Sequence, residues 1–154
     1  MTPETQATLY LRDSVPAAAR VEQEKTLGRL RALESAGHVD ELVVENWPTR
    51  VTMGTPETVP ALAAYEGFEG WARAHGVSMR PAFDRHDCHS LYTDSRFTAT
   101  VFPVMCLAVY EDEELRSVFP HARHGRSVTI CDGIAMLETD ESTTAAGRRS
   151  PPTP

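Results

Sequence analysis

An apolar run from Val101 to Tyr110 ends abruptly in the acidic residues 111–114. Because β-branched and aromatic residues fill it without alternating with polar ones, it predicts a strand buried on both faces. Pro103 has no N–H, so regular pairing is expected to begin after it. The acidic cluster predicts a solvated turn, and residues 115–119 predict a shorter, more exposed return strand. We therefore expect a hairpin at about 104–110 and 115–119.

Two amphipathic helices are predicted upstream of this hairpin. The first spans Ala17 to Ala36, with Pro16 in its first turn and Gly37 as a left-handed cap. The second is expected to begin near Thr55 or Thr58 and to end at Gly76. The core-facing side of the first helix holds Ala19, Leu27, Leu30 and Leu33, with Gln23 and Thr26 between them. The core-facing side of the second holds Ala61, Ala64, Tyr65, Phe68, Trp71 and Ala72.

The remaining pattern predicts short strands, polar loops and one more helix. Short strands are expected at 9–11 and 41–47, and alternation predicts a half-buried strand at 77–83. Polar loops follow at 84–95 and 120–127. A short helix is predicted from Thr129 to Leu137, with Thr129 and Asp132 in capping-box positions, and Cys106 is expected to be a core residue.

This order, β-α-β-α-β-β-β-α, predicts an α+β fold. We expect a mixed, largely antiparallel sheet with its two main helices packed on one face, and a ferredoxin-like core is one such arrangement. A single domain is predicted at 8–138, after a flexible N-terminus at 1–7. The tail at 139–154 is rich in Ser, Thr, Gly, Arg and Pro and is predicted to be disordered.

The net charge of the chain limits which binding partners are expected. The chain of 154 residues carries a net charge of -7, and Lys25 is its single lysine beside many arginines. An acidic surface with few lysines is typical of halophilic proteins. Excess negative charge disfavours attachment to phosphates, but in molar salt the Debye length falls to about 3 Å and the repulsion is screened. DNA binding is therefore a weaker expectation in ordinary cytoplasm than at high salt.

No apolar leader or stretch of membrane-spanning length occurs in the sequence, so we expect a soluble, cytoplasmic protein without a membrane partner. The phosphate-binding and nucleophile-elbow motifs are also missing. A Cys88 nucleophile with a nearby His and Asp84 or Asp87 would need geometry that adjacent positions rarely supply. The expectation is a protein that is not an enzyme.

Two polar loops carry side chains that suit zinc or a similar metal. His86 and Cys88 would point the same way if their segment is extended, and His121 and His124 could complete a site with Cys131. Simple surface histidines are the alternative interpretation. The metal candidates are His86, Cys88, His89, His121 and His124.

A modest basic patch is the candidate contact surface for nucleic acid. It would join Arg12 to Arg29 and Arg31 of the first helix. The alternative is that the helical arginines pair with glutamates one turn away.

Three stretches give the chain a family resemblance. They are Tyr10–Arg12 with Leu27–Glu34, Phe68–Ala72 with Pro81–Phe83, and Phe102–Glu111. In these stretches, over roughly residues 8–138, the chain resembles small haloarchaeal proteins labelled as helix-turn-helix domain proteins. The resemblance implies no catalytic residues for this chain. A helix-turn-helix joins its helices by three or four residues, whereas here about twenty residues separate the two clear helices.

Together these patterns favour a regulatory or binding module of a halophilic archaeon, acting on transcription through DNA. A small-molecule or metal sensor that uses the His and Cys loops is the alternative, and an enzyme is the third hypothesis. Exposed strand edges also predict a homodimer.

Overall fold

A computed structural model describes residues 3–93 and 95–149, with side chains as far as residue 139. Its main sheet has four strands in the order β2-β1-β6-β7. β1 pairs with β2 in parallel, while the β1–β6 and β6–β7 pairs are antiparallel. These strands are β1 (Thr5–Arg12), β2 (Glu41–Trp47), β6 (Met105–Glu111) and β7 (Glu114–Phe119).

The central strand β6 is buried on both faces, as its unbroken apolar run predicts. Cys106 and Ala108 belong to one core cluster, and Leu107 and Val109 belong to the other. Cys106 is fully buried in the core, as predicted. This burial raises the pKa of its thiol well above the ordinary value. The hairpin prediction is also confirmed, because β6 and β7 lie within a residue of the expected bounds.

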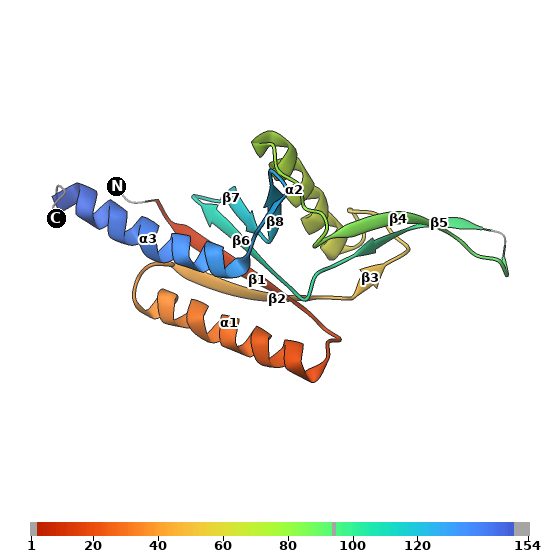
Figure 1. Cartoon of the computed structure of the whole chain (residues 1–154), viewed down its shortest axis with the longest axis horizontal. Coiled ribbons are helices and arrows are strands. Elements are labelled where there is room, and N and C mark those ends of the chain that lie inside the picture. Colours follow the sequence, from red (N-terminus) through yellow and green to blue (C-terminus); the bar gives the residue numbers. More distant parts are fainter. Residues whose placement is uncertain (1–2, 94, 150–154) are drawn as a thin grey trace.

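Helices cover both faces of the sheet (Figure 1). α1 (Ala17–Ser35) and α3 (Ile130–Arg149) pack on the face of Leu107, and α2 (Pro60–His75) packs on the face of Cys106. The α+β class and the largely antiparallel sheet are confirmed. The prediction that both main helices share one face is wrong, because β6 presents large apolar surface on each side and each side needs cover.

The sheet order also differs from the ferredoxin-like arrangement. That topology splits its β-α-β unit by placing another strand between the two parallel strands. Here β1 and β2 pair directly, from Gln6 opposite Glu41 to Arg12 opposite Trp47.

The buried side of α1 contains a polar residue that joins three parts of the chain. Gln23 is buried together with Leu30 and Leu33, on the side that the sequence predicts. Its amide donates hydrogen bonds to the carbonyl of Arg12 at 3.2 Å and to that of Val104 at 2.9 Å. The first helix is thus anchored to the end of β1 and to the loop before β6.

A second, smaller sheet projects from the body of the molecule (Figure 1). Its strands β3 (Arg50–Val51), β5 (Arg96–Val101) and β4 (Asp84–His89) lie in that order. The prediction of a polar loop from residue 84 is therefore wrong for β4, where every polar residue pairs across to β5.

The predicted strand at 77–83 is extended only in part: Ser78 forms a single antiparallel bridge with Ala122, and residues 80–82 form a turn. The N–H of Phe83 donates to the carbonyl of Met79 at 2.9 Å, and both side chains are buried. The alternating apolar positions therefore indicate burial in the core, and β pairing in this segment is limited to the bridge at Ser78.

The chain ends in a small hairpin and a long helix. The hairpin joins β8 (His121–Arg123) to β9 (Arg126–Val128), within the segment that was predicted to be a loop. Thr129 and Asp132 form the predicted capping box, with the Thr129 N–H 2.8 Å from Asp132 Oδ2. No described helix has both the length and the hydropathy needed to cross a bilayer.

The predicted ends of the domain need adjustment. β1 begins at Thr5, inside the segment 1–7 that was expected to be flexible. The backbone of α3 reaches Arg149, well past the predicted end at Leu137 and into the segment expected to be disordered. Residues 1–2 and 150–154, on which parts of both predictions fall, lie outside the described residues.

Two glycines test the packing of α3 against β7. A Cβ atom added at Gly133 would lie 2.5 Å from Cδ2 of the buried Phe119 ring, whereas one added at Gly28 would meet nothing within 4 Å. We expect Gly133→Ala to lower the free energy of unfolding by about 1–2 kcal/mol through overpacking. Gly28→Ala, the same change in α1, should raise it by about 0.5–1 kcal/mol. Urea unfolding measures both, and stabilisation by both variants would contradict this packing.

The Gln23 anchor gives a second prediction. Gln23→Met keeps the length of the side chain but removes both hydrogen bonds, so the free energy of unfolding should fall by about 1–3 kcal/mol. The control is Gln6→Met, because the Gln6 amide makes one long bond of 3.4 Å to Thr8. Equal losses of stability in the two variants would show that the two hydrogen bonds of the Gln23 amide do not stabilise the fold.

Candidate nucleic-acid interface

The β8–β9 hairpin presents two arginines at its end. Its turn residues His124 and Gly125 have φ values of 53° and 76°, the signs that a two-residue type I′ turn requires. Arg123 and Arg126 flank this turn and are directly opposite each other in the ladder. Both side chains therefore extend from the same face of the hairpin.

These arginines belong to a part of the chain that lacks acidic residues. Residues 115–131 contain Arg116, Arg123 and Arg126 but no Asp or Glu. The stretch 70–83, with Arg73 and Arg80, is also free of acids. Two hydrogen bonds join the stretches, from Ser78 N to Ala122 O at 2.9 Å and from Ala122 N to Ser78 O at 2.7 Å.

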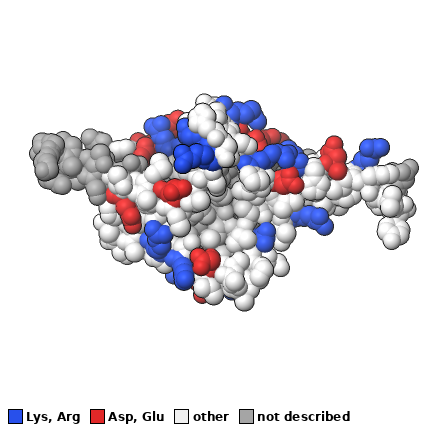
Figure 2. Space-filling model, in the orientation of Figure 1, with Lys and Arg blue, Asp and Glu red and all other residues white. Residues whose placement is uncertain are grey.

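The result is a local basic surface on an acidic protein. In Figure 2, Lys and Arg side chains gather over the region of β7, β8 and α2, with some acidic side chains among them. Among the described residues, neither Arg123 nor Arg126 forms an ion pair. Like charges directly opposite each other destabilise a ladder, so an anion between these two side chains would relieve their repulsion. We call Arg123 and Arg126 the hairpin arginines.

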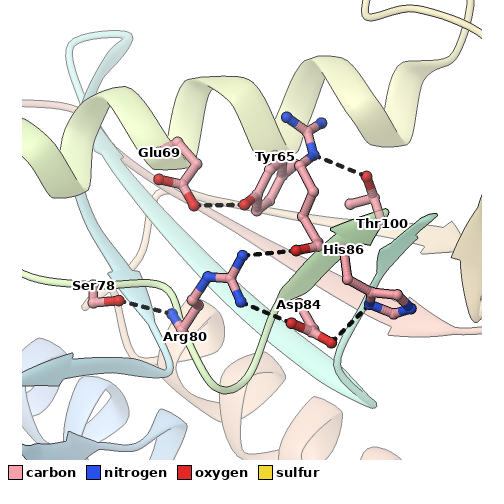
Figure 3. A network of polar contacts seen from close by, with 8 residues as sticks. Tyr65, Glu69, Ser78, Arg80, Asp84, His86 and Thr100 are labelled. Atoms are coloured by element: carbon pink, nitrogen blue, oxygen red, sulfur yellow. Dashed lines mark hydrogen bonds and ion pairs between the residues drawn. The ribbon is translucent and has the colours of Figure 1, made fainter. Parts of the chain in front are cut away.

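Arg80, by contrast, is engaged within the protein (Figure 3). Its guanidinium donates to Asp84 Oδ1 and to the carbonyl of Arg85, both at 2.8 Å. The second oxygen of Asp84 is 3.0 Å from Nδ1 of His86. These contacts fix the start of β4, so Arg80 serves the fold more than an external anion.

Arg85 and Tyr65 connect β4 to α2 in the same region, and Figure 3 shows Tyr65 beside Glu69. The Arg85 guanidinium lies 4.9 Å from the centre of the Tyr65 ring, and its Nε donates to Thr100 at 3.2 Å. The Tyr65 hydroxyl donates to Glu69 at 2.6 Å. Burial, followed by this bond and the Glu69 charge, raises the pKa of Tyr65 to about 12, so the phenol stays neutral and keeps its proton for the bond.

The three arginines predicted to contact nucleic acid do not form one patch. Arg12 is half-buried, and its guanidinium donates to the carbonyls of Ser14 and Phe102. Arg29 lies twelve helix positions beyond Ala17, about 18 Å from the start of α1 where Arg12 is. Arg31 is two positions further on, and residues two apart in a helix face different directions. Arg29 also approaches Cys131 Sγ at 3.7 Å, which ties it to α3.

The predicted metal ligands fall on two separate hairpins. His86, Cys88 and His89 are on β4, and His86 shares a strand face with Cys88, as the extended-segment argument requires. His121 and His124 are on β8 and its turn. Figure 1 shows the β4–β5 hairpin extending away from β8. In the part of the chain that the structure describes, no three His, Cys, Asp or Glu side chains form a group that could hold a metal ion.

Sequence reasoning missed the basic hairpin because residues 120–127 were interpreted as a loop. The available signal was the pair His124-Gly125 with one arginine on each side. A two-residue turn that ends in Gly between short polar strands predicts a hairpin, and a hairpin places its flanking residues opposite each other.

In a comparison with known families, the model of a helix-turn-helix domain family matches residues 1–142. Comparison with curated proteins and with solved structures finds no match. Residues 36–59, which contain β2 and β3, separate α1 from α2, and α3 follows six further strands. The family match confirms the resemblance to helix-turn-helix domain proteins, although the described residues contain no pair of helices joined by a short turn. The chain belongs to this helix-turn-helix domain family.

Proposed function

We propose that this protein is a cytoplasmic, non-enzymatic regulatory module that binds DNA and acts on transcription. The observation that carries the proposal is the pair of hairpin arginines, which lie opposite each other without an acidic partner among the described residues. Its membership of a helix-turn-helix domain family supports the same role.

The hairpin is the contact element that this geometry favours. A two-stranded ribbon fits the major groove of B-DNA, and several regulators read DNA with strands in place of a helix. Arginine side chains at the end of such a ribbon can reach phosphate oxygens or the edges of guanine bases. Arg29 and Arg31 of α1 are the alternative DNA-contact surface. They carry the same charge as the hairpin arginines, and α1 lies on the opposite face of the sheet from α2.

The overall acidity sets the conditions for binding. With a net charge of -7, the chain as a whole is repelled by phosphates, so binding depends on the local surface. The acidic charge and the single lysine support a source in a halophilic archaeon, where salt screens the long-range repulsion within about 3 Å. Short-range contacts of the hairpin arginines would then contribute more than long-range attraction.

Homodimer formation is a further part of the proposal. β2 and β7 are the edge strands of the main sheet, and unpaired strand edges can pair with a second copy. A dimer would present two basic hairpins to one duplex.

Paired charge removal on the two surfaces tests the proposal. We expect Arg123→Gln/Arg126→Gln to weaken binding to a mixed-sequence DNA duplex. The slope of log affinity against log salt should fall by about 2, because each arginine that is removed leaves one phosphate without its cation. The control is Arg29→Gln/Arg31→Gln, which removes the same charge from α1 and should leave the slope unchanged. Fluorescence anisotropy across a potassium chloride series measures both.

Two results would count against the proposal in different ways. A larger loss of affinity in the α1 variant would move the contact surface to the first helix. Absence of DNA binding by the unmodified protein at every salt concentration would remove the function itself.

A further inference from the structure

A pocket of about 400 Å³ lies beside the basic hairpin, between α2, β7, β8 and α3. This volume is within the range of small-molecule sites, which combine apolar walls with a few polar groups. Its apolar wall includes Trp71, Phe119 and Met136, and its polar groups include Arg116, His121 and Arg123.

The aromatic wall is fixed by contacts within the protein. Trp71 is buried, and its Nε1–H donates to the carbonyl of Arg116 at 2.9 Å. The His75 ring stacks on the indole at 5.1 Å between centroids, and the His121 ring meets it edge-on at 5.2 Å. A ligand would therefore pack against side chains that are already ordered, which lowers the entropy cost of binding.

His121 offers a hydrogen-bond acceptor in this pocket. His121 is only 6% exposed, and its Nδ1 lies 2.6 Å from the carbonyl of Val118. A carbonyl can only accept, so Nδ1 carries the proton and Nε2 of the neutral ring is an acceptor. Among the described residues no hydrogen bond reaches Nε2, and this atom is not among the buried atoms left without a partner. Nε2 therefore keeps some exposed surface, and His121 lines the pocket.

Arg123 offers an uncompensated positive charge. The other arginine of the pocket, Arg116, pairs with Glu111 at 3.2 Å and with Glu114 at 3.8 Å. Because Arg116 is shared between two carboxylates, it offsets only part of the charge of Glu111, the acidic side chain of the pocket. Arg123 has no such partner among the described residues, and a planar guanidinium binds a carboxylate with two parallel hydrogen bonds.

An exposed apolar side chain completes the arrangement. Met136 of α3 lines the pocket and is 46% exposed, although it is a large apolar residue. Methionine adapts its shape and makes favourable contacts with aromatic rings. It would close over a flat apolar body placed against Trp71 and Phe119.

We propose that this pocket binds a small hydroxylated aromatic carboxylate. The carboxylate would pair with Arg123, the hydroxyl would donate to Nε2 of His121, and the ring would lie between Met136 and the aromatic wall. This inference does not depend on DNA binding, because it is built from pocket residues alone. Arg123 is the one residue that both surfaces share, since Arg126 does not line the pocket.

Isothermal titration calorimetry of the full chain tests the proposal without DNA. The probes are the isomeric hydroxybenzoates, with benzoate, which lacks the hydroxyl, and phenol, which lacks the carboxylate. We expect one isomer to bind saturably and at least about tenfold more tightly than either benzoate or phenol. Arg123→Gln should weaken that isomer by about tenfold or more, because a charge-assisted pair is removed. Arg126→Gln, the same change at the cross-strand neighbour, should leave its affinity unaltered.

Three outcomes would overturn the inference. These are the absence of saturable binding by every isomer, equal binding of benzoate and the best isomer, and an equal loss of affinity in Arg123→Gln and Arg126→Gln. Both arginines are exposed, so neither variant is expected to disturb folding, and circular dichroism confirms this. The Arg126→Gln variant also separates the two proposals, because it removes a DNA contact and retains the pocket.

Discussion

The structure depends on the burial of β6 on both faces. Cys106, Leu107 and Ala108 are each fully buried, and successive side chains point to opposite sides of the sheet. One helix layer cannot cover two apolar faces, so α2 must pack against one face while α1 and α3 pack against the other. Each fully buried Leu or Phe contributes about 1.5–3 kcal/mol to stability, which makes this two-sided packing the main constraint on the fold.

That constraint also positions the candidate sites. β7 pairs with β6 and is buried through Val118 and Phe119, and β8 begins just two residues after Phe119. The basic hairpin therefore stands on the packed edge of the main sheet, next to the end of α2. The pocket forms where the two helix layers reach this same edge, with Trp71 from one layer and Met136 from the other. A rigid base of this kind lets a short polar hairpin present charges in a defined geometry.

Sequence patterns predicted the parts of the fold that local periodicity determines. The β6–β7 hairpin, α1 with its buried Gln23, the Gly76 cap and the Thr129–Asp132 capping box all have local signals, and the structure confirms them. The sheet face that a helix covers depends on contacts between segments distant in sequence. The prediction that both main helices cover the same face was therefore wrong. The alternation at 77–83 indicated burial correctly but overestimated the β pairing, which is limited to the bridge at Ser78, since a turn can also place Phe83 in the core. His121 was predicted as a metal ligand, whereas its position against Trp71 and Val118 depends on segments that are distant in sequence.

The central proposal is that the protein binds DNA through the β8–β9 hairpin. Backbone amide shifts of the full-length protein, followed by NMR while a mixed-sequence duplex is added, test it most directly. We predict saturable shift changes that centre on residues 121–128, with the amides of α1 unaffected. Shift changes that centre on α1, or no shift changes at any salt concentration, would contradict the account.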